Sequence, residues 1–429
     1  MTVEQTYKLY KAHPKVITDS RKIEKGCLFF ALKGEKFNGN QFAAEALKKG
    51  AAYAFIDENE FNTSGNTILV ENVLQTLQEL ALYHRKQLGI PILGITGSNG
   101  KTTTKELISA VLSEKYQVTF TQGNLNNHIG VPLTLLSMNK NTEIGVVEMG
   151  ANHPFEIGAL CAIADPDFGI ITNIGRAHLE GFGSFETIKK TKAELYGHVK
   201  RKGGTIFYNS DNSILQELVG DYTQTVSFGK SDANFTGEPV SSPPYVHVKV
   251  NFPSGALYLN SKLTGGYNFE NIMAAACIGN YFKVDPLKIK ASVRNYQPQN
   301  NRSQLIKKNE LQIIMDAYNA NPTSMQASIE SFVTTFSSPR FLILGDMLEL
   351  GEQSLKEHFS ILEQTKKHPF EAVFLVGPVF KNAAQNFSYF TFSDVSALCN
   401  HLAQKPIKSG SVLIKGSRGI QLEKVVDML

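Results

Sequence analysis

The sequence predicts an α/β protein built from three domains, and three observations carry this prediction. The chain has 429 residues, and about 150 residues is a common domain size. In the middle of the chain, short apolar runs alternate with segments of helical periodicity, which is typical of a parallel sheet with helices on both faces. After residue 298, four more apolar runs are each followed by a segment that favours a helix, which indicates a further doubly wound sheet.

Residues 1–85 are predicted to form a small α/β domain. The apolar segment 27–32 is one of several short apolar stretches here. Helices are expected at residues 41–49 and 73–88, and the mostly polar stretch 57–66 is expected to be a surface loop.

Residues 86–298 are predicted to form a central parallel-sheet domain of the kind found in phosphate-loop ATPases. Residues 92–95 favour a buried strand, which runs into a Gly-rich turn and then a helix at 103–114. Further strands are expected at 144–147 and 168–171. Residues 203–263 are rich in Ser, Thr, Gly and Pro with short alternating runs, so we expect an antiparallel appendage there.

Residues 299–429 are predicted to form a smaller, Rossmann-like doubly wound domain. Its strands are expected at residues 311–315, 341–344, 372–376 and 412–414, each preceding a helix.

Composition excludes several classes of protein. The net charge is only +4, which argues against a nucleic-acid-coating protein but leaves room for a local anion pocket. The four cysteines form no CxxC pair, so neither a zinc knuckle nor a disulfide framework is signalled, and we expect reduced thiols. The chain begins without an apolar signal core and has no apolar run near the ~18 residues that span a bilayer. We therefore expect a cytoplasmic protein without a membrane span.

The strongest local signal is a phosphate loop. A strand leads into Gly97-Ser98-Asn99-Gly100-Lys101-Thr102, and a helix follows. Backbone N–H groups of such a loop and the helix N-terminus favour phosphate oxygens, the lysine can bridge β- and γ-phosphates, and the threonine can hold Mg²⁺. The loop is a variant, since Ile95 stands where the strict pattern has Gly. The alternative is an ordinary Gly-rich turn, and even a nucleotide loop does not name the reaction.

Three polar residues further along the chain are candidates for chemistry. Glu148 ends a predicted strand, where a carboxylate is well placed to hold Mg²⁺. From the residues alone, the alternative is a solvated strand-end acid. His178 lies in a loop, where a structural or solvated histidine is the commoner case. Lys192 lies beside Lys189 and Lys190, which by itself indicates a basic helix face.

Taken together, several segments resemble the Mur ligases, the enzymes that build the peptide of the bacterial cell-wall precursor. The segments are residues 96–102, Glu148, residues 177–180, residues 192–194 and residues 265–271. Three further stretches, at 123–134, 316–325 and 344–351, are similar to the branch of the family that uses ATP to join D-Ala-D-Ala to UDP-N-acetylmuramoyl-tripeptide. The resemblance covers nearly the whole chain.

The resemblance implies a role for each domain and for particular residues. The first domain holds the UDP end of the precursor, the second holds ATP, and the third closes over both. Catalysis is implied for Lys101, Glu148, His178 and Lys192. Magnesium is implied at Thr102, Glu148, His178 and Lys192, with Lys192 carbamoylated. Nucleotide contacts are implied for Gly97, Ser98, Asn99, Gly100, Lys101, Thr102, Thr103, Asn268, Asn271, Arg302 and Asp316. Substrate contacts are implied for Ser20, Arg21, Asn124, Asn126, Asn127 and Asp346.

Some questions stay open at this point. The family often has Asp-Gly-His where this chain has Asn38-Gly39-Asn40, which leaves the detailed contacts of the first domain undecided. A sister Mur ligase, a folylpolyglutamate synthase and a nucleotide-binding regulator without turnover are the competing functions. The third residue of the tripeptide, diaminopimelate or lysine, is open. We expect a monomer.

Overall fold

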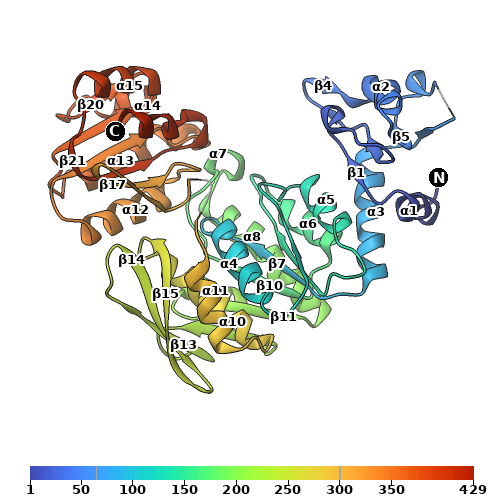
Figure 1. The fold of residues 1–429 in the computed structure, drawn as a ribbon, viewed down its shortest axis with the longest axis horizontal. Coiled ribbons are helices and arrows are strands. Elements are labelled where there is room, and N and C mark those ends of the chain that lie inside the picture. Colours follow the sequence, from blue (N-terminus) through green and yellow to red (C-terminus); the bar gives the residue numbers. More distant parts are fainter. Residues whose placement is uncertain (64, 299–300) are drawn as a thin grey trace.

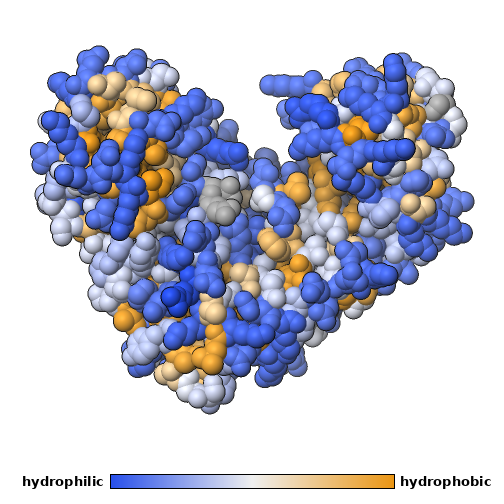
Figure 2. Space-filling model, in the orientation of Figure 1, coloured by the Kyte–Doolittle hydropathy of each residue, from blue (hydrophilic) through white to orange (hydrophobic). Residues whose placement is uncertain are grey.

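The computed structural model describes residues 1–63, 65–298 and 301–429, and it has three lobes, each around its own sheet (Figure 1). The space-filling view shows a notch between the two outer lobes, above the central one (Figure 2). The predicted α/β class with three domains is confirmed, whereas the boundaries at 85/86 and 298/299 stay predictions. Within the described residues, no helix is both long enough and apolar enough to cross a bilayer.

The first lobe is a parallel sheet with the strand order β1-β2-β5-β6. Its elements are α1 (Val3–Ala12), β1 (Val16–Ile17), β2 (Leu28–Phe30), the hairpin β3 (Lys33–Gly34) and β4 (Phe37–Asn38), α2 (Ala43–Lys48), β5 (Tyr53–Ile56), β6 (Thr67–Leu69) and α3 (Val73–Leu88). The expected helix at 73–88 is confirmed. The one expected at 41–49 is shorter, because residues 39–42 form a 3-10 turn.

Helix α3 joins the first lobe to the central lobe through buried contacts. It packs against α5 (Gly130–Leu136) and α6 (Glu156–Ala164). His84 contacts the Met138 carbonyl at 2.9 Å. The Arg85 guanidinium donates to the Ala164 carbonyl at 3.2 Å and to Asp167 Oδ2 at 2.6 Å. The predicted boundary at 85/86 therefore falls inside a helix that both lobes share.

Replacing Arg85 by alanine is expected to lower the free energy of unfolding by about 2–4 kcal/mol, because it leaves buried carbonyls and the Asp167 carboxylate without their donor. Urea unfolding of both proteins measures the change. The control is Lys86→Ala, since Lys86 is the exposed next residue of the same helix. Equal stability of the two variants would contradict a joining role for Arg85.

The central lobe is a nine-stranded sheet with the order β15-β14-β13-β12-β11-β10-β7-β9-β8. Its strands are β7 (Ile92–Thr96), β8 (Val118–Phe120), β9 (Ile144–Glu148), β10 (Phe168–Ile171), β11 (Thr205–Asn209), β12 (Thr225–Gly229), β13 (Phe235–Val240), β14 (Tyr245–Phe252) and β15 (Gly255–Thr264). Helices α4 (Lys101–Leu112), α10 (Asn268–Tyr281) and α11 (Pro286–Asn295) share one apolar core, whereas α6, α8 (Phe185–Lys202) and α9 (Ser213–Val219) contribute to the other.

The expectation of an antiparallel appendage over residues 203–263 is wrong for its first part. Strands β11 and β12 continue the parallel sheet, and β13 begins parallel to β12. Only the β13–β14–β15 pairs are antiparallel. The reason is the short helix α9, capped by Asn212 and ended at Gly220, which supplies the crossover that parallel strands need. Because this stretch has a polar composition, its sequence pattern did not predict that helix.

The third lobe is a six-stranded sheet with the order β16-β17-β21-β18-β19-β20, parallel except for the edge strand β16. Its elements are β16 (Gln304–Lys308), β17 (Glu310–Asp316), α12 (Pro322–Thr335), β18 (Arg340–Gly345), α13 (Ser354–Thr365), β19 (Ala372–Val376), α14 (Pro378–Ala383), β20 (Phe390–Phe392), α15 (Val395–Gln404) and β21 (Ser409–Lys415). All four predicted strands are present. The helix expected after the last is wrong, because 3-10 turns at 418–420 and 422–428 follow β21.

Candidate active site

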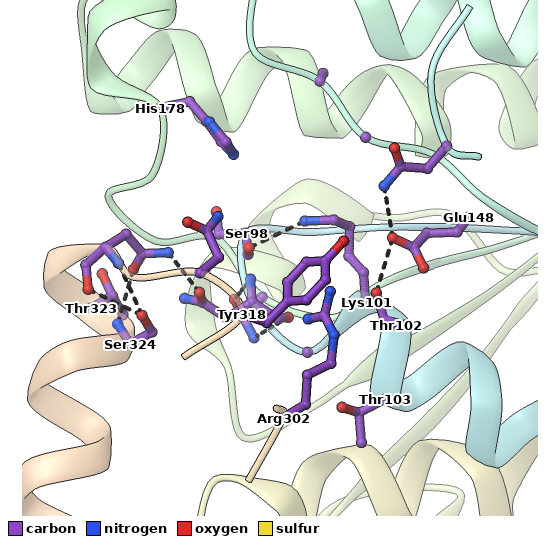
Figure 3. A pocket seen from close by; sticks show the side chains of 18 of the residues that line it. Ser98, Lys101, Thr102, Thr103, Glu148, His178, Arg302, Tyr318, Thr323 and Ser324 are labelled. Atoms are coloured by element: carbon purple, nitrogen blue, oxygen red, sulfur yellow. Dashed lines mark hydrogen bonds between the residues drawn. The ribbon is translucent and has the colours of Figure 1, made fainter. Parts of the chain in front are cut away.

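A cleft of about 850 Å³ lies where the central lobe meets the third lobe. The carboxyl ends of β7, β9 and β10 open into it, as ligand sites do in open α/β sheets. The start of α10, residues 302–303 and the start of α12 are also part of its lining. Figure 3 shows the phosphate loop in the middle of this cleft, with His178 on one side and Glu148 on the other.

The phosphate loop has the strand–loop–helix context that the sequence predicted. It follows β7, and α4 begins at Lys101, two residues earlier than expected. Gly97 and Gly100 have φ values of 145° and 78°, and an added Cβ would collide with Thr172 Oγ1 or lie 2.7 Å from Asn271 Oδ1. Only glycine fits both positions without strain.

Two hydrogen bonds hold this loop and its lysine in place. Asn99 donates its backbone N–H to Asn173 Oδ1 at 3.0 Å, and the Lys101 ammonium donates to the Gly97 carbonyl at 2.7 Å (Figure 3). Burial lowers the pKa of Lys101, while the nearby Glu148 opposes that shift. The loop therefore presents a cation among small residues, which suits phosphate oxygens.

Glu148 is a buried carboxylate beside the phosphate loop, with 1% of its surface exposed. Its Oε1 accepts from Thr102 Oγ1 at 3.2 Å and from Asn126 Nδ2 at 2.8 Å (Figure 3). Its Oε2 is buried and has no hydrogen-bond partner in the part of the chain that the structure describes. The Lys105 ammonium lies 3.7 Å from Oε2. An unpartnered buried carboxylate oxygen next to a threonine hydroxyl fits a hard cation such as Mg²⁺, so the strand-end acid is not a solvated one.

Lys192 is not part of an exposed basic face. It lies on the buried side of α8 with 2% of its surface exposed, and its Nζ is 3.4 Å from the Ala151 carbonyl. Burial, with a contribution from Lys101, lowers the pKa of Lys192 to about 7. A lysine amine that is neutral near physiological pH is the form that adds CO₂, so the surroundings of Lys192 fit a carbamate.

The same burial predicts how stability depends on pH. Because the folded-state pKa of Lys192 is about 7 and that of an unfolded lysine is about 10.4, the unfolded state binds more protons between these values, and stability rises with pH. Replacing Lys192 by methionine removes this dependence. The gain in the free energy of unfolding is expected to be on the order of 5 kcal/mol at and below pH 7 and to vanish above pH ~10.4.

Urea unfolding at pH 7 and pH 10 in CO₂-free buffer measures this difference. Parallel pH profiles for the two proteins would contradict the lowered pKa of Lys192.

His178 lies on the cleft wall with a left-handed backbone, at φ 53°. Its Nδ1 is 2.5 Å from Glu349 Oε2 in the third lobe. The contact with His178 lowers the pKa of Glu349. Within the described residues, no three His, Cys, Asp or Glu side chains gather in a way that could hold a metal. The four residues implied as metal ligands fall into the Thr102–Glu148 pair, His178 on the opposite wall, and the buried Lys192.

The residues implied as nucleotide contacts meet at this cleft from two lobes. Asn268 and Asn271 are buried at the start of α10, and Asn271 Oδ1 accepts from Thr104 Oγ1 at 2.9 Å. The Arg302 guanidinium lies 3.6 Å from the centre of the Tyr318 ring (Figure 3). Thr103, Arg302 and Asp316 also line the cleft.

Asp316 is held by ion pairing at the end of β17. Burial alone would raise the pKa of Asp316, but Lys415 at 2.6 Å and hydrogen bonds from Ser328 and the Ser303 N–H lower it below its usual value. The carboxylate is therefore charged and fixed at the cleft wall.

The residues implied as substrate contacts do not all meet in this cleft. Asn124, Asn126 and Asn127 line it, although Asn127 Oδ1 also accepts from the Ile129 and Gly130 N–H groups and so starts α5. Asp346 is 1% exposed and caps α14 through the Val379 and Phe380 N–H groups. It lies outside the cleft lining, in a structural position.

Ser20 and Arg21 lie on the first lobe, with Arg21 paired to Asp19 at 2.9 Å. Residues 38–40 are Asn-Gly-Asn in this chain, where the Mur ligases often have Asp-Gly-His. Here Asn40 is fully buried and exchanges two 2.9 Å hydrogen bonds with Asp57. This Asn therefore has a structural role.

The structure also places residues at the cleft that the sequence did not single out. Asn173 belongs to the central lobe, and Tyr318, Asn321, Thr323 and Glu349 belong to the third lobe. Lys105 lies behind the cleft wall, 3.7 Å from Glu148 Oε2. Asn321 Nδ2 donates to Asn99 Oδ1 at 2.7 Å, so a third-lobe helix cap touches the phosphate loop. The Asn-Pro pair that starts α12 is a local signal for such a cap, whereas no local pattern marks Glu349.

Comparison with known proteins agrees with this architecture. Three family models match in order: the Mur ligase family catalytic domain over residues 15–94, the Mur ligase middle domain over 95–279, and the Mur ligase glutamate ligase domain over 301–418. The UDP-N-acetylmuramoyl-tripeptide–D-alanyl-D-alanine ligase of Bacillus subtilis is 36% identical over 424 residues, which cover 96% of this chain and 92% of the relative.

Two solved structures are similar over nearly their whole length. MurF from Acinetobacter baumannii has a TM-score of 0.88 at 28% identity and covers 99% of this chain and 98% of its own. MurF from Thermotoga maritima in complex with ADP has a TM-score of 0.86 at 30% identity, with 97% of each chain covered. The fold and the cleft are those of an ATP-dependent ligase built from three α/β lobes. The chain belongs to the Mur ligase family, and the resemblance that its sequence showed is confirmed.

Proposed function

We propose that this chain is an ATP-dependent ligase that joins D-Ala-D-Ala to UDP-N-acetylmuramoyl-tripeptide. The observation that carries the proposal is one cleft that combines the phosphate loop, the buried Glu148, and the third-lobe Arg302 and Asp316. The buried Lys192 lies next to this cleft, with its Nζ 3.4 Å from the carbonyl of the lining residue Ala151. The names of relatives that cover nearly the whole chain support the choice of substrates.

The reaction has two steps that this cleft can support. First, the terminal carboxylate of the tripeptide attacks the γ-phosphorus of ATP, which forms an acyl phosphate and releases ADP. The amine of D-Ala-D-Ala then attacks the acyl carbon, loses a proton, and expels phosphate, which leaves the amide. The carboxylate itself is a poor electrophile, and the phosphoryl group makes oxygen a good leaving group.

The residues of the chain have separable parts in this scheme. Lys101 and the N–H groups of residues 97–102 bind the phosphates and offset the charge that grows on them. Arg302, stacked on Tyr318, reaches the nucleotide from the other wall. Asn126 would orient Glu148 and lie next to the peptide end. Closure of the two lobes on the cleft would keep water from the acyl phosphate.

The residues that would hold magnesium are Thr102, Glu148, His178 and a carbamoylated Lys192. The ion, when bound, neutralises charge on the phosphoryl oxygens. Carbamoylation joins the neutral Lys192 amine to CO₂ and releases one proton, which turns a buried cation into a carboxylate. That change removes the cost of burying an ammonium beside Lys101.

The remaining features of the proposal concern the rest of the molecule. The first lobe, with Ser20 and Arg21, would hold the UDP end. The boundaries at 85/86 and 298/299, a monomeric state and the cytoplasm as its compartment belong to the same proposal. A sister ligase is disfavoured by the names of the relatives, and a regulator without turnover is disfavoured by the intact set of Lys101, Glu148, His178 and Lys192.

Product analysis by mass spectrometry tests the function. The purified protein receives ATP, Mg²⁺, D-Ala-D-Ala and, in separate reactions, the diaminopimelate- or lysine-containing UDP-muramoyl-tripeptide. We expect a UDP-muramoyl-pentapeptide with one phosphate released per product, and the faster reaction names the third residue. Turnover only with free amino acids or folates would reassign the chain to a sister ligase. Nucleotide binding without any turnover would overturn the proposal.

A further inference from the structure

Ser303 directly follows Arg302, the arginine that lines the cleft from the third lobe. Ser303 is buried and has a left-handed backbone, at φ 48°. Its N–H donates to Asp316 Oδ1 at 3.2 Å, its carbonyl accepts from Thr264 Oγ1 at 2.9 Å, and its Oγ is hydrogen-bonded to the Tyr267 hydroxyl at 2.8 Å. A residue other than glycine keeps this sparsely populated conformation only where its surroundings impose it. These contacts therefore fix the chain next to Arg302.

Two of the three partners of Ser303 belong to the central lobe. Thr264 is the last residue of β15, and Tyr267 directly precedes α10, the helix that begins with the implied nucleotide contacts of the central lobe. Beside them, the Gly266 N–H donates to Ser331 Oγ of α12 at 3.0 Å. The start of the third lobe is therefore tied to the corner of the central lobe at which a nucleotide is expected.

The Tyr267 ring has a defined place in this corner. It folds back over Gly265, where an added Cβ would lie 2.5 Å from the ring atom Cζ. Gly265 also has φ 89°, a conformation that glycine adopts without steric cost. The turn before α10 thus holds the ring against the backbone of its own lobe, while the hydroxyl reaches Ser303.

Arg302 lies close enough to a second cation to need such support. Its guanidinium is 3.6 Å from the centre of the Tyr318 ring (Figure 3), and its Nε is buried without a hydrogen-bond partner among the residues that the structure describes. Burial lowers the pKa of Lys101, Glu148 opposes this shift, and the charge of Arg302 adds to it. Because like charges repel, other contacts must keep Arg302 near Lys101 until an anion binds between them. The polyphosphate of a nucleotide is such an anion.

We propose that Tyr267 and Ser303 are positioning residues, whose hydroxyl–hydroxyl bond between two lobes holds Arg302 toward the phosphates of the bound nucleotide. This proposal rests on the proposed function, since it concerns the nucleotide of the same cleft. A binding side chain that is held in its productive geometry loses less freedom when the ligand arrives. The bond between the lobes should therefore raise the affinity for the nucleotide and leave the affinity for the peptide substrates unchanged.

The experiment removes one oxygen atom at a time. Tyr267→Phe keeps the ring over Gly265, and Ser303→Ala keeps both backbone hydrogen bonds of that residue. Both changes are combined in a double variant, and Tyr267→Phe is also placed in an Arg302→Ala background. Binding of the ATP analogue AMP-PNP in the presence of Mg²⁺ is measured by calorimetry, and the melting temperature of each variant shows that it is folded.

The matched controls are Tyr258→Phe and Ser254→Ala. Tyr258 is an exposed tyrosine of β15, and Ser254 is an exposed serine in the turn before that strand. Both variants should bind AMP-PNP as tightly as the unaltered protein.

We expect Tyr267→Phe and Ser303→Ala each to weaken AMP-PNP binding about 2–10-fold, the effect of losing one hydrogen bond. The double variant should be no weaker than either single variant, because both hydroxyls belong to the same bond. Arg302→Ala should weaken binding about 10–100-fold, since it removes a charged donor, and adding Tyr267→Phe to it should change nothing further. In ligation assays the KM for ATP should rise in the same order, while the KM for D-Ala-D-Ala stays constant.

Three results would overturn the inference. The first is AMP-PNP affinity in Tyr267→Phe and Ser303→Ala equal to that of the controls. The second is a Tyr267→Phe effect of the same size with and without Arg302, which is what a merely structural role produces. The third is an unaltered protein that binds no AMP-PNP. The binding measurements need no peptide substrate, so a failure of the D-Ala-D-Ala assignment in the product assay would be distinguished from a failure of this inference.

Discussion

Replacing Lys101 by alanine is expected to reduce the rate of ligation at least about 10²–10³-fold, the loss that follows removal of one preorganised donor from charge that builds in the transition state. Lys101 is the one lysine in the loop sequence 97–102, it starts α4, and its ammonium lies at the carbonyl of Gly97. Phosphate release and pentapeptide formation should fall together.

The control for this variant is Lys140→Ala, which removes an exposed lysine from a turn of the same lobe. It should keep its full rate. An unchanged ligation rate in Lys101→Ala would remove the phosphate loop from the proposed mechanism, even if the chain proved to be a ligase by another route.

Replacing Lys192 by alanine is expected to abolish most ligation, by about 10²-fold or more, because the site loses a metal ligand and its charge. A small carboxylate such as formate or acetate should restore part of the rate, since the truncated side chain leaves room for a carboxylate near its former position. With ¹³C-bicarbonate, the unaltered protein should show a carbamate signal in NMR that Lys192→Ala lacks.

The matched control is Lys190→Ala, which changes an exposed lysine two residues earlier on α8. It should keep both the activity and the carbamate signal. Full activity in Lys192→Ala, or a signal that persists in that variant, would contradict the carbamate at Lys192.

The two variants at Lys192 test different consequences of its burial, one for stability and one for the reaction. Methionine at this position stabilises the fold, because a buried amine with a lowered pKa costs stability at neutral pH. Alanine or methionine also removes the amine that would be carbamoylated, which is the proposed reason why the protein retains a destabilising buried lysine. A residue that weakens the fold and supports the reaction is expected at a functional site.

The parts of the site that were predicted from sequence are those marked by short, contiguous sequence patterns. The phosphate loop is six consecutive residues between an apolar strand and an amphipathic helix, so its glycines, its lysine and its backbone geometry are all specified by neighbours in the chain. The strands of the third lobe were predicted for the same reason, because each is a continuous apolar run.

Local signals failed where composition masked periodicity or where a partner was distant. The helix α9 is seven residues long in a polar stretch, too short to show a repeat, and no local pattern showed that the buried Arg85 would bind the central lobe. The Asp346 carboxylate caps α14, which begins well beyond it in the chain, and no local pattern predicted that contact.

The sequence by itself determined that this protein is a three-lobed α/β Mur ligase with a phosphate loop, since those properties follow from short-range patterns and from motifs matched residue by residue. Only the tertiary structure decided that Lys192 is buried and that Glu349 meets His178. Burial and contacts between lobes depend on which helix faces and sheet edges pack together. When the residues involved are far apart in the chain, the sequence around each of them does not indicate that packing.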